Sequence, residues 1–315
     1  MARNYTNTTW TDEQVQYVKE NYLTKSNEQL GKDLGKTQSS ICNKIRRLGL
    51  IRPDKYTYDR NFFHTIDNEE KAYWLGFMCA DGYISKTRDE SYEVGIELQI
   101  GDIDHLKKFN KSIKGNVEIG TRERQLGFKN REENHKFYKQ CNIRLYSKQM
   151  VDDLYNNGCV YNKSDKLKLS KVPDDLFFHY LRGYFDGNGS VLKQTSRKRN
   201  CIRFNFTTAS YDFVTELREL LYNKYNITSY IVKEKIRYED GIQAYRLNVS
   251  GLENNYRFGK MLYDNAHIYL DRKYNRYIEL SEQFDMENRI NKFSNERIEK
   301  ARNTFFSHHE RKTYS

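Results

Sequence analysis

Two segments of this chain are near-copies of each other. Residues 73–84 read YWLGFMCADGYI, and residues 180–191 read YLRGYFDGNGSV. Aligning Gly76 with Gly183 gives an offset of 183 − 76 = 107 residues, which is enough for a compact domain. In both halves we expect a glycine-ended helix, alternating strands, a helix, a hairpin and another helix. The sequence therefore predicts a duplicated body.

Small residues follow one face of each repeated helix. Gly76 and Ala80 are four residues apart, and so are Gly183 and Gly187. Residues at this spacing lie on the same side of a helix, so we expect the two helices to pack closely, with Gly76 and Gly183 at their interface. A left-handed conformation that ends each helix is expected at two further glycines, Gly82 and Gly189.

The two copies differ at the last polar side chain before the helix ends, which is Asp81 in the first copy and Asn188 in the second. A carboxylate is unfavourable at the C-terminal end of a helix, because the helix dipole is negative there. A divalent metal beside a phosphate would neutralise it. A hydrogen bond from a local backbone N–H or an ion pair with a lysine would serve as well, and the sequence leaves these alternatives open.

The strands expected after each helix alternate between apolar and polar residues. In residues 91–100, for example, Val94 and Ile96 fall on one face, and Glu93 and Gln99 fall on the other. Antiparallel sheets of this kind keep one face in water, and Arg, Asn and Gln on that face match the donor and acceptor patterns of the DNA major groove. The candidates for DNA contact on these faces are Glu93, Gln99, Asn142, Arg144, Arg199, Arg203, Asn205, Lys233, Lys235, Arg237, Arg246 and Asn248.

Residues 1–52 predict a separate domain of three short helices. Thr11 and Gln14 form a capping box for the first helix, and Gly35 ends the second. A third helix after a glycine turn is typical of a helix-turn-helix. The segment resembles Myb-like modules that begin with a Trp-Thr-x-Glu/Asp-Glu signature; a small protein-binding domain is the alternative. The candidate DNA contacts are Gln38, Ser39, Asn43, Lys44, Arg46 and Arg47.

Composition favours a nucleic-acid partner. The 315 residues carry a formal net charge of +11, with a pI of about 9.2, which suits a polyanion, although a basic surface also serves solubility. The five cysteines form no C-x-x-C pair, so a zinc site is not expected. We find no run long enough to span a membrane and no signal peptide, and we expect a cytoplasmic protein of a bacterial or phage-infected cell.

Residues 53–66 are expected to be a linker and residues 284–315 a basic tail.

The repeated segments resemble the two copies of the motif that names the LAGLIDADG homing endonucleases. WLGFMCADG (74–82) and LRGYFDGNG (181–189) align with its nine positions without gaps. The resemblance extends over residues 67–283, through NGCVYNKS (157–164) and YLDRKYNRY (269–277).

This resemblance implies an α+β fold with two related halves. The halves would span residues 67–172 and 173–283, each with the element order αββαββα, and be related by a pseudo-twofold axis. Their saddle-shaped antiparallel sheets would lie in the DNA major groove. The small all-α helix-turn-helix domain would precede them.

The resemblance also implies a function and a site. The chain would be a site-specific double-stranded DNA endonuclease, a monomer on a long asymmetric target, that uses Mg²⁺ or Mn²⁺. In the family the penultimate motif residue binds the metal, which assigns this role to Asp81 and Asn188, with the preceding Ala80 and Gly187. The basic residues expected to assist the charged transition state are Lys163, Arg272 and Lys273.

Asn188 departs from the family pattern, because an amide oxygen can bind a metal but carries no charge. Asp186 cannot replace it, since two positions along a helix point the side chain elsewhere, and in the family that position is structural. The chain could be an enzyme that nicks or cleaves weakly, a DNA-binding protein without cleavage, or an engineered Asp→Asn form. The alternatives to the nuclease are a non-catalytic sequence-specific DNA-binding regulator and an RNA-binding intron maturase.

Overall fold

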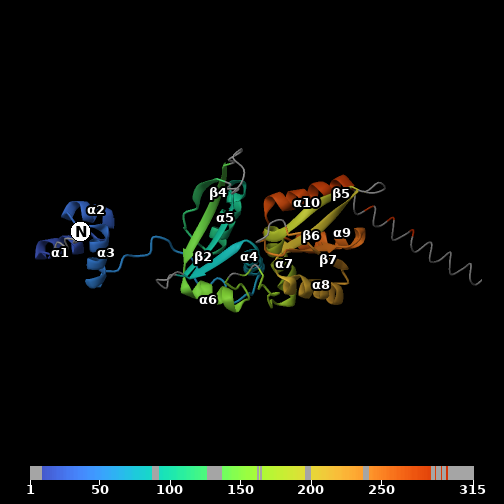
Figure 1. The fold of residues 1–315 in the computed structure, drawn as a ribbon, viewed down its shortest axis with the longest axis horizontal. Coiled ribbons are helices and arrows are strands. Elements are labelled where there is room, and N and C mark those ends of the chain that lie inside the picture. Colours follow the sequence, from blue (N-terminus) through green and yellow to red (C-terminus); the bar gives the residue numbers. More distant parts are fainter. Residues whose placement is uncertain are drawn as a thin grey trace, which may run out of the picture. The chain divides into compact units, whose positions relative to one another are not determined.

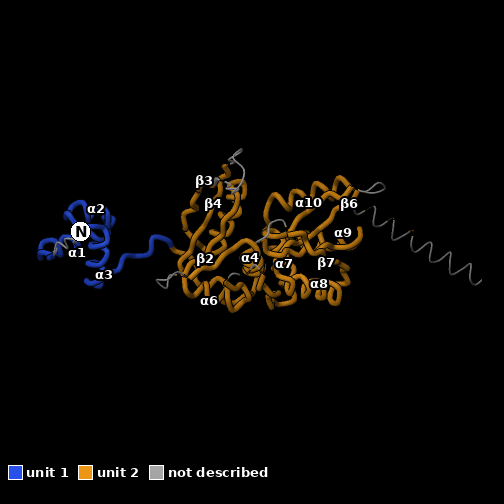
Figure 2. Tube along the Cα trace, viewed as in Figure 1, with its two compact units in different colours: residues 1–56 blue, residues 57–315 orange. Residues whose placement is uncertain are grey.

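The computed structural model describes residues 9–86, 92–125, 137–161, 163, 165–195, 200–236 and 241–284, together with residues 288, 292 and 296. The chain divides into two compact units, Met1–Tyr56 and Thr57–Ser315 (Figure 2). We found no helix in the described part of the chain that is long and apolar enough to cross a lipid bilayer.

Unit 1 has three helices whose ends follow from the local sequence. The Thr11 hydroxyl accepts a hydrogen bond from the backbone N–H of Gln14, and the Gln14 side chain accepts one from the backbone N–H of Thr11. Gly35 ends the second helix with a φ of 63°, a left-handed conformation that favours glycine. One side chain from each helix is fully buried in the core: Val18, Leu30 and Ile41. The helices are α1 (Asp12–Asn21), α2 (Asn27–Leu34) and α3 (Gln38–Arg47).

Unit 2 contains the duplicated body, and the predicted α+β fold class is confirmed. Both halves follow the order αββαββα, and one further helix follows the second half (Figure 1). The first half consists of α4 (Glu69–Ala80), β1 (Gly82–Lys86), β2 (Tyr92–Gln99), α5 (Ile103–Ser112), β3 (Gly120–Gln125), β4 (Phe137–Tyr146) and α6 (Lys148–Asn156). The second half consists of α7 (Phe177–Asn188), β5 (Gly189–Thr195), β6 (Asn200–Thr208), α8 (Tyr211–Tyr225), β7 (Ser229–Lys233), β8 (Tyr245–Val249) and α9 (Leu252–Tyr263), followed by α10 (Asp271–Phe284).

Each half forms one antiparallel sheet, with strand orders β1-β2-β4-β3 and β5-β6-β8-β7. The alternation in the sequence decides which face of each sheet is covered. Val94 and Ile96 are fully buried, and Phe204 and Phe206 pack against Phe258 of α9. The helices thus cover the apolar faces, and the opposite faces carry the polar residues.

The repeated helices α4 and α7 lie side by side between the two sheets (Figure 1). Their backbones are in direct contact at two glycines. A Cβ atom added to Gly76 would overlap the carbonyl oxygen of Tyr180, and one added to Gly183 would overlap the carbonyl oxygen of Tyr73. Glycine is required at both positions, as the small-residue pattern predicts.

The prediction of left-handed helix ends at Gly82 and Gly189 is wrong. Neither glycine has a positive φ. Gly82 begins β1 directly after α4, and Gly189 begins β5 in an extended conformation. Lack of space is the physical reason for glycine here, because a Cβ would collide with the Met78 side chain at Gly82 and with the Phe185 ring at Gly189.

Residues 57–66, which lie within the predicted linker, pack on the first half. The backbone N–H of Asp59 donates to the carbonyl of Ile113 at 2.7 Å. The Phe62 and Phe63 rings are buried and meet edge to face. The aromatic residues of this segment therefore belong to the core of unit 2.

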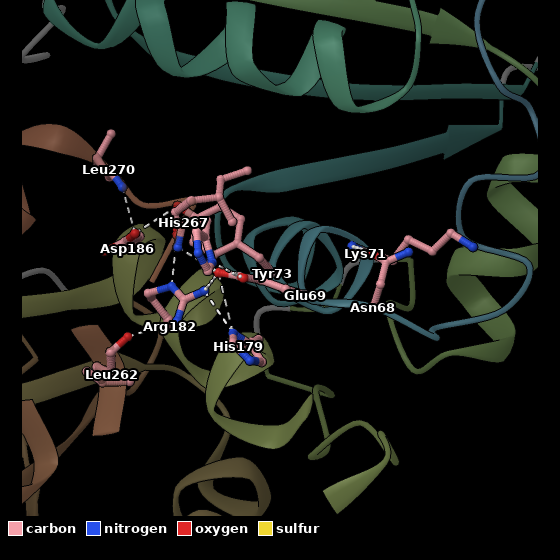
Figure 3. Close-up of polar contacts among 11 residues, drawn as sticks. Asn68, Glu69, Lys71, Tyr73, His179, Arg182, Asp186, Leu262, His267 and Leu270 are labelled. Atoms are coloured by element: carbon pink, nitrogen blue, oxygen red, sulfur yellow. Dashed lines mark hydrogen bonds and ion pairs between the residues drawn. The ribbon is translucent and has the colours of Figure 1, made fainter. Parts of the chain in front are cut away.

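A buried carboxylate joins the two halves. Asp186 on α7 accepts hydrogen bonds from the hydroxyl of Tyr73 (2.7 Å) and from the backbone N–H of Leu270 (2.7 Å) (Figure 3). It accepts a third from the hydroxyl of Tyr263 (2.8 Å). Its burial raises the pKa of the carboxyl, and the nearby Lys273 and the three donors act against that rise. Asp186 is structural, as expected from its position in the helix.

An ion pair crosses the same junction one helical turn away, at the first residue of α4. Arg182 of α7 is 2% exposed, and its guanidinium donates to Glu69 of α4 at 2.6 Å. It also donates to the carbonyls of Ile268 (2.8 Å) and Leu262 (2.9 Å). The backbone N–H of His267 donates to the same Glu69 carboxylate at 2.9 Å (Figure 3). The segment before α10 is thus tied to both repeated helices.

His105 of α5 extends this chain of hydrogen bonds. Its Nε2 lies 3.1 Å from the Tyr73 hydroxyl oxygen. Because the Tyr73 hydroxyl donates to Asp186, the imidazole must donate from Nε2. Its buried Nδ1 has no hydrogen-bond partner among the described residues, so a second proton would be unsatisfied there. Burial, with nearby cations, lowers the pKa of His105 to about 3.

We predict that Gly183→Ala strongly destabilises unit 2. The new methyl group would meet backbone atoms of α4, which cannot rotate away as a side chain can. Overpacking in a well-packed core typically costs about 1–3 kcal/mol, and we expect a loss at or above the upper end in urea unfolding. Gly101→Ala is the matched control, because a Cβ there meets no atom within 4 Å. Equal stability of the two variants would contradict the close packing.

We predict that His105 makes the fold sensitive to acid. The folded pKa of about 3 lies below the ordinary value of 6.5, so the unfolded chain binds this proton first. The stabilising contribution is complete above about pH 6.5 and is lost as the pH falls toward 3, with a slope of at most about 1.4 kcal/mol per pH unit. Urea unfolding between pH 7 and 4 should show a shallower decline for His105→Gln than for wild type. An unchanged slope for His105→Gln would exclude this role.

Candidate active site and nucleic-acid interface

Asp81 lies directly after the last residue of α4, with a half-buried side chain. No hydrogen bond to its carboxylate is formed by the described residues. Burial raises the pKa of the carboxyl, while the charges of Lys273, Lys163 and Arg272 act in the opposite direction. The site therefore holds a partly buried carboxylate at the negative end of a helix, and the cost of its burial exceeds the effect of the three nearby cations.

A lysine caps the end of each repeated helix. The Lys163 ammonium donates to the carbonyls of Met78 and Gly82. The Lys273 ammonium donates to the carbonyls of Phe185 (2.8 Å) and Gly187 (3.1 Å). Met78 and Phe185 occupy matching positions of the repeat, so the two lysines serve the same carbonyl in each half. Burial lowers the pKa of Lys273 to about 8, against the opposing charge of Asp186.

Arg272, the third predicted basic residue, links the halves. Its Nε lies 3.0 and 3.2 Å from the two carboxylate oxygens of Asp102, which belongs to the first half. The side chain is 48% exposed, whereas that of Asp102 is 6% exposed. The guanidinium can therefore still face solvent or a ligand while Asp102 holds it in place.

Asn188 ends α7 with a half-buried side chain, and its amide donates to the Tyr184 hydroxyl at 3.4 Å. The preceding residue lies against the other motif helix: a Cβ added to Gly187 would be 3.3 Å from the carboxyl carbon of Asp81 and would overlap the Cβ of Ala80. The structure thus brings Asp81, Ala80 and Gly187 together at one end of the helix pair, with Asn188 adjacent in sequence.

The donors at this junction suit a hard cation only in part. No group of three or more His, Cys, Asp or Glu side chains that could hold a metal occurs in the described residues. The junction offers the Asp81 carboxylate and the Asn188 amide oxygen, while Ala80 and Gly187 have only backbone carbonyls. Mg²⁺ is commonly held by one or two carboxylates together with substrate phosphates. The set therefore fits Mg²⁺ if phosphate oxygens complete the coordination.

The polar face of the first sheet carries the predicted residues. Glu93, Gln99, Asn142 and Arg144 all lie on the face opposite the buried apolar side chains. Glu93 accepts a hydrogen bond from the Tyr83 hydroxyl at 2.5 Å and is 3.7 Å from the Arg144 guanidinium. Two arginines of this face were not among the predicted contacts, although the alternation in β3 could have revealed them. They are Arg122 and Arg124, both ion-paired with Glu97.

The second sheet matches the prediction less well. Arg203 and Arg246 lie on its polar face and are partly exposed, and Arg246 is paired with Glu234 at 3.0 Å. Asn205 and Asn248, predicted to be exposed, are only 4% and 5% exposed. They lie directly opposite each other on β6 and β8, the two central strands, so each has a neighbouring strand on both sides.

Two predicted lysines of this half are exposed, as expected, and two arginines are not described. Lys233 pairs with Tyr245 on the face that the helices cover, and not on the polar face. Lys235 follows the end of β7. The face of Lys233 is set by the pairing of β7 with β8, and the local pattern does not reveal this register. Arg199 and Arg237 lie outside the described residues.

In unit 1, α3 presents most of its predicted contacts to solvent. Lys44 is the exception: it is half-buried, with its ammonium 5.1 Å from the centroid of the Trp10 ring. Lys36 lies over the same ring at 5.5 Å. The exposed members of the predicted set are Gln38, Ser39, Asn43, Arg46 and Arg47.

Comparison with known proteins gives one match to a protein family. Residues 176–262, which cover most of the second half, match the LAGLIDADG-like domain. The replication factor C small subunit of Methanocaldococcus jannaschii is 26% identical over 235 residues, which are 67% of this chain. The chain spans only 12% of that much longer protein.

Several solved structures are similar at low sequence identity. The LAGLIDADG homing endonuclease I-GzeII, in complex with its DNA target, aligns with 71% of this chain and 92% of its own, at 12% identity and a TM-score of 0.45. The meganuclease I-SmaMI, bound to uncleavable DNA, aligns with 67% of this chain and 88% of its own, at 12% identity and a TM-score of 0.43.

We predict that Asp81→Asn stabilises the fold, because it removes a partly buried carboxylate, without a hydrogen-bond donor among the described residues, from a helix C-terminus. A charge there typically costs about 0.3–1 kcal/mol, and we expect a gain of that size in urea unfolding at pH 7 without divalent metal. Asp186→Asn is the matched comparison and should cost about 2 kcal/mol or more, because it weakens three hydrogen bonds to a charged acceptor. A loss of stability in Asp81→Asn would instead identify Asp81 as a structural cap.

Proposed function

We propose that this chain is a site-specific DNA endonuclease of the LAGLIDADG homing type. The observation that carries the proposal is the junction of α4 and α7, where two motif copies pack through Gly76 and Gly183 and present Asp81 at their common end. The match of residues 176–262 to the LAGLIDADG-like domain supports the same assignment.

The residues at the junction have distinct roles in this proposal. Asp81 would hold one divalent cation, Mg²⁺ or Mn²⁺, and the Asn188 amide oxygen would hold another, each together with phosphate oxygens of the substrate. Each cation, when bound, supplies Lewis-acid polarisation of a scissile phosphate. Lys163 and Lys273 lie at the ends of the two helices and add positive charge where the phosphorane-like transition state develops charge. Arg272 is held by Asp102 toward the same region.

The two halves are not equivalent in this mechanism. Asp81 brings a full negative charge, whereas Asn188 brings only an amide dipole, so cation affinity is lower on the Asn188 side. Each half of such an enzyme acts on one strand of the duplex. We therefore propose that one strand is cut faster than the other and that nicked DNA accumulates.

The polar faces of the two sheets would bind the target duplex. They carry arginines from both halves, and a net charge of +11 favours association with DNA. We propose that unit 1 adds contacts through α3, that the chain acts as a monomer on a long asymmetric site, and that it works in the cytoplasm of a bacterial or phage-infected cell.

A second candidate function is a sequence-specific DNA-binding regulator that does not cleave. The observation that favours it is Asn188, whose amide is engaged with Tyr184 and leaves Asp81 as the single carboxylate at the helix ends. Both candidates use the same DNA-binding faces, so only the reaction separates them.

The distinguishing experiment uses a supercoiled plasmid that carries the uninterrupted insertion site of the chain's own gene. With Mg²⁺ we expect open circles before linear DNA, and Asp81→Asn should slow the first cut to about the rate of the second. Loss of even an outer-shell partner of a metal typically costs about 10–100-fold, so Asn188→Asp should speed the second cut by about tenfold or more. Initial rates of both cuts on agarose gels give this ratio.

Two results would contradict this proposal. Unchanged supercoiled DNA together with a specific gel shift would favour the regulator. An Asn188→Asp variant that leaves the second cut unchanged would show that residue 188 is not a ligand. Incubation with EDTA is the control for contaminating nucleases that need no metal.

A further inference from the structure

The polar faces of the two sheets differ in chemistry. The face of the first sheet consists of Arg, Glu, Gln, Asn, Ser, Gly and Tyr residues, with no aliphatic side chain among its described positions. The face of the second sheet also carries Leu192 on β5 and Val232 on β7, which are 44% and 39% exposed. The two halves therefore offer different contacts to a ligand that lies along both sheets.

The register places both aliphatic side chains on the polar face. Leu192 pairs with Arg203, and Val232 pairs with Arg246. Residues that lie opposite each other on antiparallel strands point to the same side of the sheet. The neighbours of Leu192 and Val232 in sequence have the other orientation: Val191, for example, is 8% exposed, on the helix-covered face.

A single exposed leucine needs no explanation, but this pair shares a face with arginines and other polar residues, and two of those polar residues are withdrawn from a ligand. Asn205 and Asn248 are nearly inaccessible there, and Arg246 is held by Glu234. The exposed recognition groups of this face are thus partly aliphatic. In the major groove, the group that an aliphatic side chain can recognise is the C5-methyl of thymine.

We propose that Leu192 and Val232 are specificity-determining residues that contact thymine methyl groups. This proposal rests on the proposed function, since it requires that the sheets lie in the major groove. The half-site under the second sheet then requires thymine, with its methyl group, at two positions. The half-site under the first sheet is recognised through hydrogen bonds, and its thymines tolerate loss of the methyl group.

The test begins with selection of the bound sequence from a randomised duplex pool, using the full chain without Mg²⁺. Each thymine of the selected site is then replaced by deoxyuridine, which lacks only the C5-methyl. One buried methyl group is worth about a fourfold change in affinity, so we expect two thymines, both in one half of the site, at which the replacement weakens binding by about that factor.

Variants assign the two positions to the two residues. Leu192→Ala should abolish the deoxyuridine effect at one position, and Val232→Ala at the other. Leu23→Ala, at a leucine of unit 1 that is 59% exposed, should leave both effects unchanged. Both tested side chains are exposed, and the scan with the wild-type chain does not depend on the folding of any variant.

The outcomes separate this inference from the proposed function. A selected site that tolerates deoxyuridine throughout, or whose sensitive positions persist in both variants, would overturn the inference and leave the nuclease proposal standing. Sensitive positions spread over both halves of the site would also overturn it. A pool that yields no enriched sequence would overturn sequence-specific DNA binding, and this inference with it.

Discussion

The contact between the backbones of α4 and α7 is the interaction on which the rest of unit 2 depends. At Gly76 and Gly183 each helix touches the carbonyl of the other, so no side chain separates them. This contact fixes the distance between the two sheets and brings both helix C-termini to one place. Helix dipoles that end together concentrate partial negative charge. Lys163 and Lys273 offset this charge, because each donates hydrogen bonds to the carbonyls at one of these helix ends.

The glycine contact itself has no side chains, so the side chains around it must hold the two halves together. Buried charges are costly unless they are well paired, and here they are. Arg182 has one carboxylate and two carbonyls as acceptors, and Asp186 has three donors. Removal of a single partner would leave a buried charge with fewer hydrogen bonds, so the network favours the arrangement of the halves in which all of them form.

Much of this could be predicted from the sequence, because the repeat fixes the topology and the spacing of small residues fixes the helix pair. The failures have a common origin in neighbours that are distant in sequence. Gly82 and Gly189 are glycines because of nearby side chains and have no left-handed conformation. The exposure of Asn205 and Asn248 depends on β8, and so does the face of Lys233. Local periodicity predicts to which face of a strand a side chain points. It does not predict which residues from other strands and helices cover that side chain.

Each motif copy has an acidic residue at one of two positions, and the position differs between the copies. The first copy has Asp81 at the helix end and Cys79 two residues earlier, whereas the second has Asn188 at the helix end and the buried Asp186 two residues earlier. Burial raises the pKa of both carboxyls, and the charge of Lys273 acts on both. A third carboxylate at residue 188 would add like charge at the same helix ends. Asn188 therefore suits a junction that folds without bound metal, while Asp81 keeps a carboxylate that has no hydrogen-bond donor among the described residues and that a cation would stabilise.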